Sequence, residues 1–184
     1  MRKLKLQAQI TVDGFIAGQN GEMDWLVFDW DDKLKSYVEE ITKPVDTIIL
    51  GRKLAQGLIP HWASHPEMDG AKKINNSKKV VFTKTLDESE WDNTELAKGD
   101  IVEEITRLKK LSGGDIIVYG GATFASALIK TGLIDEYHLF VNPVAIGTGM
   151  PIFKDLKEKL HFTMTKSFSF ECGITVLNYS PKQN

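Results

Sequence analysis

The sequence predicts an α/β fold in which helices flank a mixed, mainly parallel central sheet that ends in an antiparallel hairpin. The first two-thirds of the 184 residues alternate short apolar segments with amphipathic ones, the pattern of strands followed by helices. The last third consists of strand-like segments only, which indicates antiparallel strands at the end of the sheet. No repeat, linker or low-complexity segment divides the chain, so we expect one domain over residues 1–184.

Each element is predicted from apolar spacing and from the residues that stop it. Residues 3–12 alternate with period two, and residues 31–43 place apolar side chains every three or four positions, with Asp31 or Asp32 as the helix cap. Residues 59–77 contain Pro, His and Asn and are expected to form a loop. The remaining strands are expected at 45–50, 79–83, near 95–97, and at 115–119, 135–147, 161–170 and 174–180; the remaining helices at 101–111 and 122–131, with a short one beginning near 52.

Composition excludes several functional classes. The net charge is −2 with no long basic run, so neither nucleic acid nor a membrane surface is an expected partner. No apolar stretch reaches the length of a membrane span, and the N-terminal segment has the pattern of a strand, so the default location is the cytoplasm. The single cysteine, Cys172, cannot form an internal disulfide, and the four histidines lack ligand spacing, so no metal site is predicted.

The most informative segment is 115–131, where an apolar strand runs through Gly120 and Gly121 into a helix. Two glycines let a ligand approach the backbone, because no β-carbon intervenes. The free N–H groups at the start of the helix favour an anion such as a pyrophosphate, and Thr123 adds a hydroxyl there. The alternative is a tight turn that binds no ligand.

Basic residues follow two other predicted strands. Arg52 and Lys53 come after the strand at 45–50, and Thr83 and Lys84 end the strand at 79–83. Ligands of open α/β sheets bind beyond the carboxyl ends of the strands, where these cations would form a second anion site. The alternative is that each is a solvated surface charge. The chain has no GxGxxG after its first strand, so any nicotinamide nucleotide must bind through a different topology.

Taken in order, these motifs resemble a known family. TVDGFIAG, MDW, IILGRK, VVFTK and IIVYGGATFASALI together resemble the three-layer fold of dihydrofolate reductase, and LIDEYHLFVNPVAIGTGMPIF is similar to the reductase domain of bacterial riboflavin biosynthesis. That domain reduces a pyrimidine ribosyl phosphate with NADPH. The resemblance covers residues from about 4 to 179 and is greatest to stand-alone bacterial members of this superfamily. It implies an NADPH-dependent reductase in which Met23 and Trp25 lie in a loop over the substrate pocket. The same residues could instead serve core or loop packing. The cofactor-binding residues that it implies are Ala8, Ile16, Gly18, Gly51, Arg52, Lys53, Leu54, Thr83, Lys84, Tyr119, Gly120, Gly121, Ala122, Thr123 and Phe124.

The sequence departs from these relatives at the expected proton donor. The acidic residue that dihydrofolate reductases carry on the first helix corresponds to Trp30 here, with Asp29 and Asp31 on either side. The riboflavin reductase is usually fused to a zinc deaminase with an HxE and PCxxC signature, and the single cysteine of this chain is not enough to build that signature. Asp24, Asp29 and Asp31 are therefore the candidate acids. An acid buried beside the neighbouring aromatic residues would have a raised pKa, and the alternative role is a helix cap or a solvated loop.

Three functions remain open from the sequence. The first is an NADPH-dependent reductase of a small heterocyclic or carbonyl-containing metabolite. The second is a non-catalytic nucleotide-binding module, and the third is a dihydrofolate reductase. The apolar strands near the C-terminus would expose a sheet edge, which dimerisation would cover, and the related reductase domains are often dimers. We therefore expect a homodimer.

Overall fold

The computed structural model describes residues 1–182 and contains one large and one small sheet. The strands are β1 (Leu4–Thr11), β2 (Phe15–Ala17), β3 (Val45–Gly51), β4 (Lys78–Phe82), β5 (Thr94–Ala97), β6 (Asp115–Tyr119), β7 (Glu136–Asn142), β8 (Met150–Pro151), β9 (Phe162–Ser169) and β10 (Thr175–Pro181). The helices are α1 (Asp32–Thr42), α2 (Arg52–Ser64), α3 (Ala71–Asn76), α4 (Ile101–Lys110) and α5 (Ala122–Ile129).

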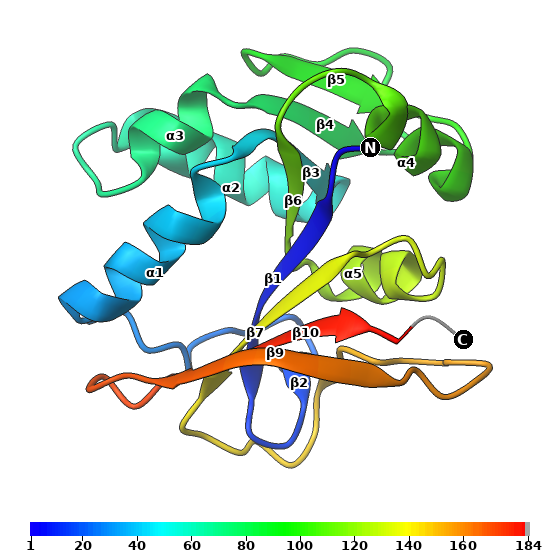
Figure 1. Cartoon of the computed structure of the whole chain (residues 1–184). Helices are drawn as coiled ribbons and strands as arrows, with labels where there is room; N and C mark the ends of the chain where they lie inside the picture. The colour runs from blue at the N-terminus through cyan, green and yellow to red at the C-terminus, as the bar shows by residue number, and fades with distance from the viewer. Residues whose placement is uncertain (183–184) are drawn as a thin grey trace.

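The central sheet has eight strands in the order β5-β4-β3-β6-β1-β7-β10-β9 (Figure 1). The first six strands in this order are parallel to one another, whereas β10 runs antiparallel to β7 and to β9. The predicted mixed sheet with a C-terminal antiparallel hairpin is therefore confirmed. The two edge strands are β5 and β9, and the residues of β9 are largely exposed.

Helices cover both faces of the sheet, so the molecule has three layers. On one face, α4 and α5 pack against the even-numbered residues of β1 through side chains such as Leu108 and Leu128. On the other face, α2 and α3 pack over β3 and β4. α1 packs separately on β7 and β10, where Leu34 and Tyr37 contact Phe140. This second face thus has two apolar clusters instead of one.

Between these two clusters lies a polar strip on β1. Its odd-numbered residues Lys5, Gln7, Gln9 and Thr11 point to the same face because side chains alternate along a strand. None of the four belongs to either apolar cluster. β1 is therefore apolar on one face and polar on the other, although it lies at the centre of the sheet.

The segment after β3 differs from the prediction. α2 continues to Ser64 with Pro60 inside it, and α3 follows, where a loop was expected over 59–77. Proline removes one backbone hydrogen bond from a helix, but Ile59 and Trp62 pack into the core on either side of it. This packing keeps the segment helical and brings the rings of His61 and His65 within 4.6 Å, a proximity that the sequence did not predict.

Two smaller differences concern strands. β2 and β8 form a separate two-stranded sheet that the sequence did not predict, because each is only two or three residues long. β7 ends at Asn142 instead of continuing to 147. Within the described residues, no helix is long and apolar enough to cross a membrane.

Candidate functional site

The expected site lies where β1 and β6 part. The pairing of β1 with β6 ends at Gln7 and Tyr119, after which Gly120 and Gly121 lead the chain into α5. β1 continues to Thr11 and is paired there with β7 alone. The sheet is thus open on one side of β1, beyond the carboxyl end of β6, which is where open α/β sheets bind ligands.

Both glycines of this turn have backbone conformations that other residues rarely adopt. The φ angle is +44° at Gly120 and +79° at Gly121. A β-carbon on Gly120 would lie 3.6 Å from Cδ1 of Ile16, and one on Gly121 would lie 3.5 Å from Cβ of Leu54. The turn therefore touches the segment after β1 and the first turn of α2 and leaves its own backbone uncovered by a side chain.

The ends of β3 and β6 are joined by close packing. A β-carbon placed on Gly51 would lie only 2.7 Å from Cβ of Phe124, so no side chain fits there. The ring of Phe124 in turn lies 4.9 Å from the ring of Phe82 at the end of β4. The three strand ends to which the sequence assigned two anion sites thus meet around the start of α5.

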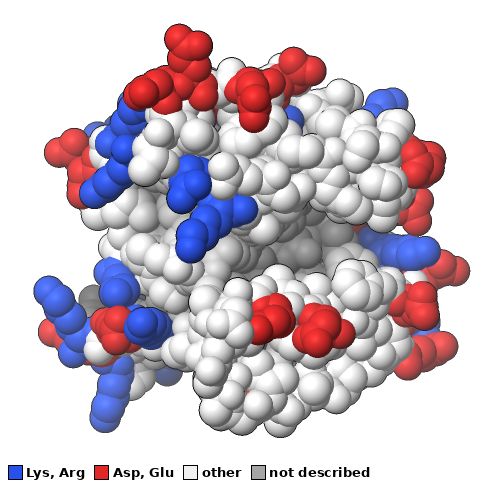
Figure 2. Space-filling view, turned by 180° about the vertical axis from the view of Figure 1, so that it is seen from behind, with Lys and Arg blue, Asp and Glu red and all other residues white. Residues whose placement is uncertain are grey.

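The basic residues at these strand ends lack acidic partners within residues 1–182. Arg52 donates only to the side-chain oxygen of Gln56, one turn along its own helix, at 3.1 Å. Neither Lys53 nor Lys84 forms an ion pair in the described part of the chain, and both are exposed. Figure 2 shows a hollow between the two halves of the molecule, with Lys and Arg side chains at its two ends and Asp or Glu side chains below its lower margin. This arrangement suits an anionic ligand, because the cations are not neutralised.

Thr83 has a structural function that the sequence did not indicate. Its side chain is buried, and its hydroxyl oxygen accepts hydrogen bonds from the backbone N–H groups of Thr85 and Leu86, both at 3.1 Å. The hydroxyl therefore fixes the loop that carries Lys84. By contrast, Thr123 is exposed in the first turn of α5, beside Ala122, where its hydroxyl is free to meet a ligand.

The segment between β2 and α1 is held over the same end of the sheet. The carbonyl of Gly18 accepts from the N–H of Gly21, and Gly18 itself donates to the carbonyl of Glu22 at 2.8 Å. Further along, the N–H of Val27 donates to Oδ1 of Asn142 at 3.0 Å. Met23 and Trp25 lie between these two attachments and are half-buried, and the indole N–H of Trp25 is buried without a partner in the described residues. Ala8, in contrast, points its methyl group into the core, so only its backbone can border a ligand.

The three candidate acids do not form a buried acidic centre. Asp24 and Asp29 are exposed. Asp31 caps α1 by accepting from the N–H of Leu34 at 2.9 Å, and it also accepts from the N–H of Cys172 at 3.2 Å. The hydrogen bond from Leu34 lowers the pKa of Asp31, so the raised pKa expected for an acid in this segment is wrong for this residue. Its capping role, the alternative from the sequence, is the one the structure supports.

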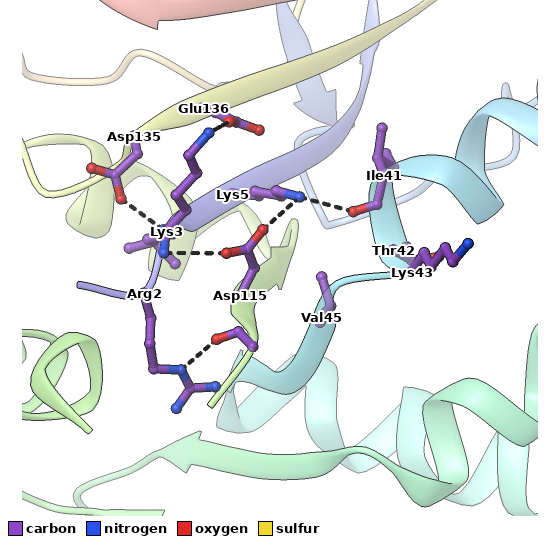
Figure 3. Close-up of polar contacts among 12 residues, drawn as sticks. Arg2, Lys3, Lys5, Ile41, Thr42, Lys43, Val45, Asp115, Asp135 and Glu136 are labelled. Atoms are coloured by element: carbon purple, nitrogen blue, oxygen red, sulfur yellow. Dashed lines mark hydrogen bonds and ion pairs between the residues drawn. The ribbon is translucent and has the colours of Figure 1, made fainter. Parts of the chain in front are cut away.

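The sequence did not reveal a second polar cluster at the amino ends of the same strands. Nζ of Lys5 is buried and lies 2.9 Å from Oδ2 of Asp115 and 3.1 Å from the carbonyl oxygen of Ile41 (Figure 3). Lys3 pairs with Glu136 at 2.6 Å. Buried charges on a central strand were not predicted, because the alternation of charged and apolar residues at 3–12 looked like a half-exposed strand.

Buried His138 extends this cluster across β7. Its Nδ1 lies 2.8 Å from the hydroxyl of Tyr37, and its Nε2 lies 3.4 Å from Oε2 of Glu136. The hydrogen bond from His138, together with Lys3, lowers the pKa of Glu136 to about 2. The cationic and anionic groups of this cluster are therefore paired with one another. No group of three or more metal-ligating side chains occurs among residues 1–182.

A model of the RibD C-terminal domain family matches residues 2–176 of this chain. The chain belongs to the RibD C-terminal domain family. Among curated proteins, it is 36% identical over 183 residues to the uncharacterized protein YyaP of Bacillus subtilis, covering 97% of this chain and 94% of that protein. The family is that of a reductase domain, in agreement with the resemblance found in the sequence.

Solved structures show the same fold. A protein of Shewanella sp. PV-4 assigned to riboflavin biosynthesis matches with a TM-score of 0.77 and 23% identity over the whole of both chains. The diaminohydroxyphosphoribosylaminopyrimidine deaminase/5-amino-6-(5-phosphoribosylamino)uracil reductase of Thermotoga maritima matches with a TM-score of 0.70 and 18% identity, covering 98% of this chain and 57% of that one. These structures confirm the predicted dihydrofolate reductase-like fold.

Proposed function

We propose that this protein is a reductase that binds NADPH and directs a hydride to a small heterocyclic metabolite. The proposed reaction is similar to the reduction named for the Thermotoga relative, 5-amino-6-(5-phosphoribosylamino)uracil reductase. The observation that carries the proposal is the convergence of three strand ends on the start of α5, with Gly51 against Phe124 and Gly121 against Leu54.

The residues at this convergence fit a dinucleotide. The glycine turn and the N–H groups that begin α5 suit the pyrophosphate, because the backbone there is uncovered and the helix dipole favours an anion. Arg52, Lys53 and Lys84 carry uncompensated positive charge at the ends of β3 and β4, which suits the additional ribose phosphate and favours NADPH over NADH.

When bound, NADPH supplies a hydride from its nicotinamide ring. The protein has to orient the ring against an electrophilic carbon and exclude water. Ile16 and the backbone of Ala8 border the opening between β1 and β6. The segment carrying Met23 and Trp25 is held by hydrogen bonds at both ends, and in this proposal it lies over the bound ring. Because Asp24 and Asp29 are exposed and Asp31 caps a helix, we propose that water delivers the proton that balances the hydride.

The same observation about the carboxylates favours a second candidate, a non-catalytic nucleotide-binding module of the same fold. Reduction of dihydrofolate is less well supported, because Trp30 stands at the acidic position and its indole N–H donates to the carbonyl of Val27 at 2.8 Å. Turnover separates these candidates. Binding of NADPH without its oxidation by any member of a carbonyl, pterin and pyrimidine panel would favour the module.

Titration with NADPH and NADH, followed by nicotinamide fluorescence, tests the cofactor site. Lys84→Ala is expected to weaken NADPH binding about tenfold and NADH binding much less, because the removed charge would face the additional phosphate. Gly121→Val is expected to abolish binding of both nucleotides, since a side chain would enter the turn.

Matched controls lie at the other end of the same helix. Lys130→Ala removes an exposed lysine just after α5, and Gly132→Val strains a glycine with a similar φ angle, +68°, and open space around it. Neither control should alter nucleotide binding. Failure of the wild-type protein to bind either nucleotide would contradict the proposed function.

We also propose that the protein is a homodimer that pairs through β9. β9 is one of the two edge strands, and Met164 and Phe168 are 50% and 38% exposed on it. An open edge with apolar side chains is a surface on which a second strand can pair. Light scattering should give the mass of a dimer at micromolar concentration, and Met164→Lys should give a monomer. A monomeric wild-type protein would contradict this proposal.

A further inference from the structure

The polar strip of β1 contains two glutamines, and only one of them has a hydrogen-bond partner for its side-chain oxygen in the described residues. Oε1 of Gln9 accepts from Nδ2 of Asn142 at 2.8 Å, and Asn142 in turn accepts from the N–H of Val27. Gln9 is therefore part of the structure that holds the segment over the site. Gln7 is 8% exposed, and its Oε1 is buried with no hydrogen-bond partner in the described residues.

An unpaired buried amide oxygen is unfavourable for the folded protein. An acceptor left unsatisfied loses its hydrogen bonds to water without replacement, whereas an apolar side chain of similar size has no such loss. Both neighbours of Gln7 in the sheet carry polar groups, Tyr119 on β6 and His138 on β7. The Nδ1 of His138 already bonds to Tyr37, so it does not satisfy Gln7. The position therefore suits a partner from outside the chain.

Gln7 lies beside the proposed cofactor site. Its backbone carbonyl accepts from the N–H of Gly120 at 3.3 Å, and it is the last residue of β1 that pairs with β6. Its side chain belongs to the polar strip between the apolar cluster under α2 and the cluster under α1. A substrate placed against a nicotinamide in the opening between β1 and β6 would meet this strip.

The phenol of Tyr119, the neighbour of Gln7 on β6, is uncharged. Burial raises the pKa of Tyr119 to about 12, so its phenol keeps its proton at neutral pH. The exposed carboxylates of Asp24 and Asp29 lie on a different segment. Gln7 and Tyr119 together offer donors and acceptors but no net charge, which matches a neutral polar ring better than a charged group.

We propose that Gln7 is a specificity-determining residue that recognises the amide-type edge of a neutral heterocycle, an N–H next to a C=O. A carboxamide offers one acceptor and two donors from a single plane, so it can accept from the ring N–H and donate to the ring carbonyl at the same time. Rotation about the last torsion of the side chain exchanges the two polar atoms with little strain. This inference rests on the proposed reductase function and names the class of its substrate.

The test uses two probes of similar shape, uracil and 1,3-dimethyluracil, of which only the first retains ring N–H groups. Their affinities are measured by ligand-observed NMR on the NADPH-loaded protein. The wild-type protein is expected to bind uracil at least tenfold more tightly than its dimethyl analogue, because the analogue leaves the amide unpaired. Gln7→Met should reduce this preference to less than twofold.

Thermal unfolding of Gln7→Met and Gln9→Met separates recognition from a structural role. Gln7→Met should leave the Tm unchanged or raise it, because it removes an unpaired polar atom. Gln9→Met should lower the Tm by about 3–6 °C, because it breaks the bond to Asn142. A lower Tm for Gln7→Met with an unchanged probe preference would mean that a buried water satisfies the amide, and it would overturn the inference.

The outcomes also distinguish this inference from the proposed function. If NADPH does not bind, the reductase proposal fails first. If NADPH binds but the wild-type protein does not prefer uracil over dimethyluracil, the cofactor site stands and the role of Gln7 is overturned.

Discussion

The amino and carboxyl ends of the parallel strands differ in how their charged side chains are paired. At the amino ends, Lys3, Lys5 and Arg2 each meet an acidic side chain, and the buried Lys5 also meets a backbone carbonyl (Figure 3). At the carboxyl ends, Arg52 and Lys84 have no acidic partner within the described residues. A closed network contributes to folding, whereas uncompensated cations contribute little to it and remain available for a ligand.

The glycines show the same contrast. Gly114, near the amino ends, binds the guanidinium of Arg2 through its carbonyl at 2.6 Å and donates its N–H to Asp46 at 2.6 Å. Gly120 and Gly121, at the carboxyl ends, leave most of their surroundings open. Substitutions at the amino ends of the strands therefore test stability, and substitutions at the carboxyl ends test binding.

The largest expected effect is on stability, at the amino end. Lys5→Ala leaves Asp115 without its partner and leaves the carbonyl of Ile41 without a donor. Removal of one member of a buried ion pair costs about 3–5 kcal/mol, and urea denaturation measures this loss. NADPH affinity of the folded variant should not change.

The control for this variant is Lys33→Ala. Lys33 pairs with Glu171 at 3.2 Å, but both side chains are largely exposed. Its loss should change the free energy of unfolding by no more than about 0.5 kcal/mol. Equal effects of the two substitutions would contradict the importance assigned to the buried network.

A smaller effect at the same end depends on pH. The pKa of Glu136 is lowered from 4.5 to about 2 by the hydrogen bond from His138 and by Lys3. A lowered pKa in the folded state contributes stability that is fully present above pH 4.5 and is lost as the pH falls towards 2. Glu136→Gln should therefore flatten the acidic limb of a plot of unfolding free energy against pH.

Glu171→Gln is the matched control for the pH experiment, because its carboxylate is exposed in a surface pair. The acidic limb of this variant should coincide with that of the wild-type protein. If Glu136→Gln keeps the acidic limb of the wild-type protein, other carboxylates account for the acid sensitivity.

The smallest expected effect on stability comes from an arginine at the carboxyl end. Arg52→Ala removes one exposed hydrogen bond to Gln56 and should change the free energy of unfolding by less than about 0.5 kcal/mol, while weakening NADPH binding. Arg2→Ala is the comparison, since the buried Arg2 contacts Asp46, Thr47 and the carbonyl of Gly114. Substantial destabilisation by Arg52→Ala would mean that the carboxyl end is also structural.

The predicted helices and strands were confirmed where local signals agreed with packing. The helix over 31–43 appears as α1 with Asp31 as its cap, and the hairpin at the C-terminus turns at Gly173, with φ at +90°. The prediction failed at Pro60, where local propensity indicated a loop and burial of Ile59 maintained a helix. β2 and β8 are too short to have a periodic pattern.

The sequence alone determined the layered α/β fold, the family and the glycine turn, because these depend on spacing within short segments. Only the tertiary structure decided which of these segments meet, since the contact of Gly51 with Phe124 joins positions 73 residues apart. It also decided that Lys5 and His138 are buried and paired, and that Gln7 differs from Gln9. The pattern of polar and apolar residues in a sequence is the same whether or not a polar side chain has a hydrogen-bond partner. Only the neighbours of that side chain in space determine what its burial costs.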